Sequence, residues 1–139
     1  MKIQESAENY LEAILTLGRK NGFVRSVDIA AELEFSKPSV SVAMRNLRES
    51  GCIKVDPEGF ITLTGKGRII AEGVYERHTI ISKCLMALGV NERTAQIDAC
   101  RTEHVLSAES FDAIKKFYEK YKNTQGPPPL NVTLKQDVY

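Results

Sequence analysis

The residues best suited to chemistry in this chain stand together at Cys100-Arg101-Thr102-Glu103-His104. On a helix, positions i, i+3 and i+4 share one face, so Cys100, Glu103 and His104 can direct a thiolate, a carboxylate and an imidazole toward one point. These groups are suitable ligands for a first-row transition metal, and a thiolate favours Fe(II), Co(II), Ni(II) or Zn(II) over Mn(II). The alternative interpretation is that Cys100 is a small buried apolar residue and that His104 packs between helices.

A catalytic metal is a second possibility for the same residues. His78 together with Cys100, Glu103 and His104 could hold a hydrolytic zinc with an open position and a glutamate as base. The sequence has no HExxH pair, no glycine-rich phosphate loop and no nucleophile elbow to complete such a site. We therefore predict that the protein is not an enzyme.

The cysteines and the N-terminus bear on where the protein works. Cys52, Cys84 and Cys100 are odd in number and widely spaced, which argues against a disulfide framework and for a reducing compartment. The first residues form no apolar signal run, and no stretch approaches the roughly 18 uninterrupted apolar residues of a membrane span. We expect a cytoplasmic protein that does not associate with a membrane.

The elements that must position these side chains are mostly helical. Apolar residues recur at helical spacing over residues 6–19, and short helices capped by Ser26 and Ser36 follow. The pattern then alternates, which predicts a β-hairpin with arms at 52–55 and 60–63.

Three further helices complete the predicted structure. They begin at caps Thr64, Asn91 and Ser107, and the first two extend to about Leu88 and Leu106. A Gly-Pro-Pro-Pro run forbids helix after that. The predicted fold is mainly α with a small β-hairpin wing. It comprises a winged helix-turn-helix over residues 1–72, a helical domain over 73–122 and a Pro-containing extended tail over 123–139.

Three helices followed by a hairpin are the winged helix-turn-helix pattern, in which the third helix reads DNA. The face of this helix opposite its apolar stripe offers hydroxyl and guanidinium donors for bases or phosphates, and Val42 can touch a thymine methyl. The predicted DNA-binding residues are Lys37, Pro38, Ser39, Ser41, Val42, Arg45, Arg48, Lys54 and Lys66.

The charge distribution agrees with this prediction. The formal net charge of the chain is only +1, but residues 37–68 contain six basic and three acidic residues. A local excess of this kind favours contact with a phosphate backbone. A winged helix that docks another protein is the alternative, and a steep loss of duplex binding with rising salt would separate the two.

The order of elements resembles the diphtheria-toxin-repressor family of iron- and manganese-dependent regulators. The resemblance covers roughly residues 5–122. It rests on Ala7-Glu8-Asn9-Tyr10-Leu11-Glu12, Val27-Asp28-Ile29-Ala30, Lys37-Pro38-Ser39-Val40-Ser41, Leu63-Thr64-Gly65-Lys66-Gly67, His78, and Ala99-Cys100-Arg101-Thr102-Glu103-His104-Val105-Leu106-Ser107.

The resemblance implies which residues hold the metal. Cys100, Glu103 and His104 match the iron-sensing branch, whereas Glu12 resembles the manganese branch, and His78 matches a ligand of both. Asn9 stands where the family places a methionine or aspartate ligand and can offer only a neutral carbonyl oxygen. Two positions of an ancillary site carry other residue types, Ser82 and Gln96.

The resemblance also implies the function. We expect a homodimer, formed through the helical domain, that binds palindromic operator DNA as a repressor when a divalent transition metal is bound. Fe(II) or Mn(II) is the expected ion, and Co(II), Ni(II) or Zn(II) could replace it in vitro. The alternative is a winged-helix DNA-binding regulator that responds to redox state or to a small molecule and has a degraded metal site.

Overall fold

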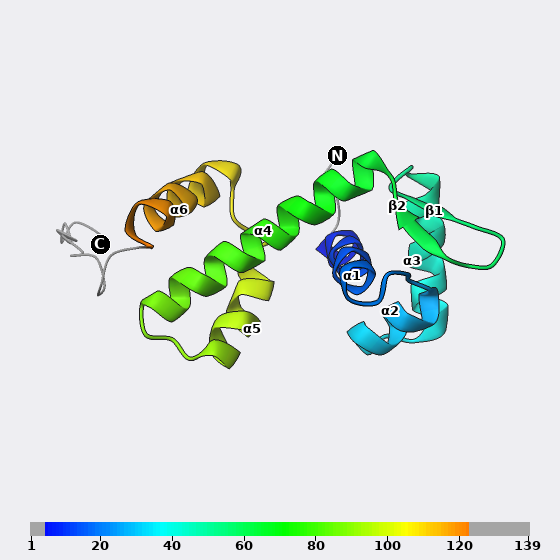
Figure 1. The fold of residues 1–139 in the computed structure, drawn as a ribbon, viewed down its shortest axis with the longest axis horizontal. Helices are drawn as coiled ribbons and strands as arrows, with labels where there is room; N and C mark the ends of the chain where they lie inside the picture. Colours follow the sequence, from blue (N-terminus) through cyan, green and yellow to red (C-terminus); the bar gives the residue numbers. More distant parts are fainter. Residues whose placement is uncertain (1–4, 123–139) are drawn as a thin grey trace, which may run out of the picture.

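The computed structural model describes residues 5–122, and the predicted tail lies outside the described residues. Two lobes lie at opposite ends of one long helix (Figure 1). In chain order the elements are α1 (Glu5–Asn21), α2 (Ser26–Leu33), α3 (Lys37–Glu49), β1 (Ile53–Val55), β2 (Ile61–Leu63), α4 (Gly65–Ala87), α5 (Glu92–Thr102) and α6 (Ala108–Tyr121). The predicted fold class, helical with a hairpin wing after the third helix, is confirmed.

The N-terminal lobe, which we call the reading head, consists of α1, α2, α3 and the hairpin. Its strands pair antiparallel with Ile53 opposite Leu63, and Ile61 N–H donates to the Val24 carbonyl at 2.8 Å, which ties the hairpin to the loop after α1. The core is apolar and well enclosed, since Leu11 and Ile29 have no exposed surface.

Helix caps behave largely as the sequence predicts. The side chains of Ser36, Thr64, Asn91 and Ser107 each accept a backbone N–H from the first turn of the helix that follows. Such caps satisfy donors that have no partner inside the helix. The prediction that Ser26 caps the second helix is wrong. Arg25 is the N-cap of α2, and its backbone N–H donates to the Asp28 carboxylate at 2.8 Å.

A close approach joins the wing to α4. A Cβ atom on Gly67 would lie 2.0 Å from the Cys52 carbonyl oxygen, so no other residue type fits there without a shift of the backbone. Thr64 N–H donates to the same carbonyl at 3.0 Å. The first turn of α4 therefore rests directly on the base of the wing.

The helical lobe consists of most of α4 with α5 and α6. The boundary predicted at residue 72 falls inside α4, so the two lobes share this helix. The prediction that the fifth helix extends to about Leu106 is wrong, because α5 ends at Thr102 and a turn connects it to the cap of α6 at Ser107. No helix within residues 5–122 is long and apolar enough to cross a membrane.

Candidate metal centre

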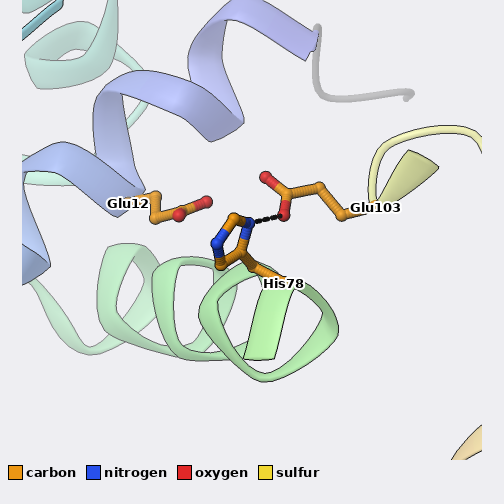
Figure 2. A group of neighbouring side chains, drawn as sticks. All are labelled: Glu12, His78 and Glu103. Atoms are coloured by element: carbon orange, nitrogen blue, oxygen red, sulfur yellow. Dashed lines mark hydrogen bonds and ion pairs between the residues drawn. The ribbon is translucent and has the colours of Figure 1, made fainter. Parts of the chain in front are cut away.

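Three side chains from three helices meet between the lobes. Glu12 comes from α1, His78 from the middle of α4, and Glu103 from the C-cap of α5 (Figure 2). One ligand atom from each lies within 4.8 Å of the others. His78 Nδ1 is 2.9 Å from Glu103 Oε2. Sequence reasoning predicted all three residues, and the fold brings them together.

Two carboxylate oxygens in this group lack hydrogen-bond partners. Glu103 is 1% exposed, and neither its Oε1 atom nor Glu12 Oε2 accepts a hydrogen bond, although both are buried. His104 Nε2 lies at an ion-pair distance of 3.3 Å from Glu103 Oε1. A buried polar atom without a partner is costly, and a buried carboxylate more so. A cation placed among these oxygens would satisfy both atoms. The donor set of two carboxylates and an imidazole therefore fits a divalent metal ion.

The raised pKa values of Glu12 and His78 also indicate that these carboxylates require a positive charge beside them. The pKa of Glu12 is raised to about 7, first by burial and then by the adjacent Glu103 carboxylate. The pKa of His78 is raised to about 9, chiefly by its hydrogen bond to Glu103. Without metal, a proton on His78 supplies the positive charge that these carboxylates require.

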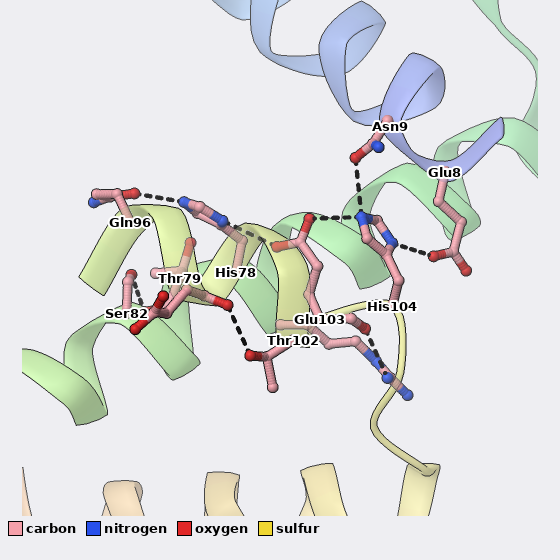
Figure 3. A network of polar contacts seen from close by, with 11 residues as sticks. Glu8, Asn9, His78, Thr79, Ser82, Gln96, Thr102, Glu103 and His104 are labelled. Atoms are coloured by element: carbon pink, nitrogen blue, oxygen red, sulfur yellow. Dashed lines mark hydrogen bonds and ion pairs between the residues drawn. The ribbon is translucent and has the colours of Figure 1, made fainter. Parts of the chain in front are cut away.

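His104 extends the site toward the N-terminal end of α1. Its Nδ1 atom lies 2.6 Å from Glu8 Oε2, and its Nε2 atom lies 2.9 Å from Asn9 Oδ1 (Figure 3). The same Nε2 atom is 3.3 Å from Glu103 Oε1. The predicted residues Asn9 and His104 are thus neighbours and adjoin the group of Glu12, His78 and Glu103. Sequence reasoning did not assign Glu8 to the site, although it belongs to the same Ala7-Glu8-Asn9 segment.

Cys100 does not join the three-residue group. It lies on the last full turn of α5 and is exposed. Partial desolvation raises the pKa of its thiol, and the negative charges of Glu103 and Glu12 raise it further. The thiol is therefore close enough to sense these carboxylates.

Of the two residues at ancillary positions, Ser82 turns inward and Gln96 contacts the site. Ser82 is buried, and its hydroxyl donates to the Thr79 carbonyl of the preceding turn at 3.1 Å. Gln96 Oε1 lies 2.5 Å from His78 Nε2.

Arg77 secures the turn that carries Glu103 and His104. Its Nη1 atom donates to the carbonyls of Glu103 and Leu106 at 3.1 and 2.8 Å. The guanidinium also lies over the Phe111 ring of α6, 5.1 Å from the centroid. These carbonyls follow the end of α5 and would otherwise lack a helical donor. Sequence reasoning missed Arg77, although its position beside His78 was a usable signal.

The predicted DNA-binding residues are all exposed, and all of them except Lys66 of α4 belong to the reading head. Those on α3 from Lys37 to Arg48 are solvent-exposed, and so is Lys54 on β1. Lys66 is exposed as well, and its Nζ atom donates to the Ser50 carbonyl at 2.8 Å.

Arg25 supports the wing from outside this set. Its guanidinium donates to the Glu58 carbonyl and lies 4.8 Å from the centroid of the Phe60 ring. The position of the wing thus depends on a residue at the start of α2.

Both lobes match known protein families. Residues 2–60 match the iron dependent repressor, N-terminal DNA binding domain. Residues 64–127 match the iron dependent repressor, metal binding and dimerisation domain. The chain is 36% identical over 118 residues to the transcriptional regulator MntR of Escherichia coli, an alignment that covers 85% of this chain and 76% of the relative.

Solved structures show the same architecture. A manganese-dependent transcriptional repressor in complex with manganese is 26% identical with a TM-score of 0.75, covering 81% of this chain and 52% of that chain. The manganese regulator SloR is 27% identical with a TM-score of 0.73, covering 81% and 53%. This chain therefore spans about half the length of these two structures.

Proposed function

Because this chain belongs to the family of iron-dependent repressors, metal-dependent transcriptional regulators, we propose that it represses transcription as a cytoplasmic homodimer on palindromic operator DNA. In this proposal Glu12, His78 and Glu103 form the centre of the metal site, with Asn9, Cys100 and His104 around it. The observation that carries the proposal is the pair of buried carboxylate oxygens that accept no hydrogen bond, one on the reading head and one on the helical lobe.

The position of this pair gives the metal its regulatory effect. Glu12 belongs to α1 of the reading head, and Glu103 follows α5 of the helical lobe. A cation that binds both carboxylates stabilises the arrangement of lobes that brings them together. Metal that binds the DNA-competent arrangement more tightly shifts the population toward it, and operator DNA must favour metal binding by the same factor.

The donor types bear on which metal is used. Carboxylates and a neutral imidazole suit Mn(II) and Fe(II), and the named structural relatives are manganese regulators. Participation of Cys100 would add a thiolate and move the preference toward Fe(II), Co(II), Ni(II) or Zn(II). The exposed position of Cys100 outside the three-residue group supports a site whose main ligands are oxygen and nitrogen.

An apolar groove on the helical lobe supports the homodimer. It has a volume of about 1060 Å³ and runs along the C-terminal half of α4, α5 and α6, where Leu85, Ile114 and Phe117 are among its lining residues. Phe117 is 44% exposed, and a patch of this kind usually marks a protein–protein contact. A second copy of the chain is the proposed occupant, because the matched domain is one of dimerisation.

The exposed face of α3 supports DNA recognition by the reading head. Ser41, Val42 and Arg45 occupy the face opposite the buried Val40 and Met44. A two-fold dimer would present two such helices to half-sites about one helical turn apart. The redox or small-molecule alternative is not favoured, because both matched domains are those of metal-dependent repressors.

The test is duplex binding by the purified protein under anaerobic conditions, first with chelator and then with each metal added in turn. We expect strong stimulation by Mn(II) or Fe(II), which is lost in Glu103→Ala and retained in Glu92→Ala, an exposed glutamate at the start of α5. Arg45→Ala should weaken duplex binding without changing metal affinity. Tight DNA binding that ignores metal, or equal behaviour of the two glutamate variants, would contradict the proposal.

A further inference from the structure

His78 is held from both sides of its imidazole ring. Nδ1 faces Glu103 Oε2 at 2.9 Å, and Nε2 faces Gln96 Oε1 at 2.5 Å (Figure 3). Gln96 and Glu103 are seven residues apart, which is about two helical turns, so both point toward α4 from the same side of α5. One helix therefore supplies a partner for each nitrogen of one histidine.

The Gln96 contact is a hydrogen bond and leaves no room for an ion. Two ligands that share a metal each lie about 2.0–2.2 Å from it, which places them roughly 3 Å or more apart. The separation of 2.5 Å between His78 Nε2 and Gln96 Oε1 is shorter than that. The amide oxygen accepts a hydrogen bond from Nε2–H.

This contact decides which nitrogen is free to bind. A neutral imidazole has one N–H and one lone pair, and a histidine ligand usually donates its N–H to an outer partner that fixes its orientation. We propose that Gln96 is a positioning residue of the metal site: by accepting from Nε2–H it directs the Nδ1 lone pair of His78 toward the carboxylates of Glu12 and Glu103. This inference rests on the proposed metal-dependent function.

The positioning role of Gln96 differs from the ligand role that its place in the sequence implies. Gln96 stands where a ligand of an ancillary site was expected from the family resemblance, and a neutral amide is a weak substitute for a histidine ligand. In the structure the amide oxygen of Gln96 accepts a hydrogen bond from the His78 ring, so Gln96 acts on the metal site through His78.

Three variants test the proposal by metal affinity, measured by competition with a chromogenic chelator. Gln96→Met keeps the length of the side chain but removes the acceptor, and we expect affinity for Mn(II) and Zn(II) to fall about 10- to 100-fold. Gln96→Glu restores an acceptor oxygen and should return affinity to within a few-fold of the original protein. Arg93→Met, on an exposed residue about one turn earlier on α5, should have no effect.

Nitrogen NMR of the Zn(II)-loaded, ¹⁵N-labelled protein gives a readout that a general loss of structure would not mimic. In the original protein, the His78 signals should show a protonated Nε2 and a metal-bound Nδ1. In Gln96→Met, this single pattern should be lost, while the thermal unfolding of the metal-free variant matches that of Arg93→Met.

The outcomes separate this inference from the proposed function. If the original protein binds metal and Gln96→Met binds it equally well, or if Nε2 is the metal-bound nitrogen, Gln96 has no positioning role and the repressor proposal stands. If the original protein does not bind metal in the chelator competition, the proposed function fails and this inference fails with it.

Discussion

The two lobes of this molecule are built on different principles. The large apolar core cluster of the reading head draws on α1, α2, α3 and the hairpin and ends at Ala71 of α4. The helical lobe contributes a smaller set of buried apolar residues: Val74, Ile80, Ile81, Ala95, Ala99 and Phe111. It also buries the charged Glu103 and leaves an apolar groove open.

This difference indicates where each lobe obtains its stability. Apolar burial contributes about 25 cal/mol per Å², so the enclosed core is a main source of stability for the reading head. A buried carboxylate and an open groove cost stability until a cation and a second chain satisfy them. We infer that the reading head does not need a ligand for its stability, whereas the stability of the helical lobe depends on a bound cation and on a second chain.

The largest expected effect on stability comes from a substitution that creates a cavity in the core of the reading head. Leu11→Ala should lower the free energy of unfolding by about 2–5 kcal/mol, because Leu11 is fully buried and its loss leaves a void. Urea denaturation measures this change, with the exposed Val42→Ala as the control. A loss below 1 kcal/mol would show that the head is not the tightly packed lobe.

Metal should stabilise the protein by a similar amount. At a free metal concentration about 100 times its Kd, the stability should rise by about 2.7 kcal/mol, and Glu103→Gln should remove this increment. Thermal unfolding with and without metal provides the measurement. An increment that persists in Glu103→Gln would place the metal elsewhere.

A smaller effect is expected at the turn between α5 and α6. Arg77→Met removes two hydrogen bonds to backbone carbonyls and the contact with Phe111, at a cost of about 1.5–3 kcal/mol. Because the turn carries Glu103 and His104, metal affinity should fall as well. The conservative Arg77→Lys should retain part of both. If Arg77→Met lowers stability but leaves metal affinity unchanged, the turn does not position the ligands.

The smallest effect is expected at the wing. Arg25→Met loses a cation–π contact with Phe60 worth about 0.5–1 kcal/mol at an exposed site, together with the bond to the Glu58 carbonyl. Duplex affinity should fall several-fold and about equally for all sequences, because the wing contacts are expected to be made to phosphates. Metal affinity should not change. A change in metal affinity would show that the two lobes are coupled through the wing.

Much of this structure could be predicted because its signals are local. The caps at Ser36, Thr64, Asn91 and Ser107 are encoded within a few residues of each helix start, and the switch from helical to alternating periodicity locates the hairpin. Helical periodicity predicts a later end for α5 than Thr102, and the local sequence does not show that Arg77, from another helix, binds the carbonyls of Glu103 and Leu106.

The sequence by itself determined the fold class, the four helix caps named above, the exposed face of α3 and the candidate ligands, since periodicity, capping and family motifs are properties of the chain. Only the tertiary structure decided that Glu12, His78 and Glu103 meet, that Glu8 and Asn9 contact His104, that Cys100 lies outside the three-residue group, and that Gln96 holds His78. The physical reason is distance along the chain. These contacts join residues up to 96 positions apart, and their geometry depends on how α1, α4 and α5 pack, which no local pattern encodes.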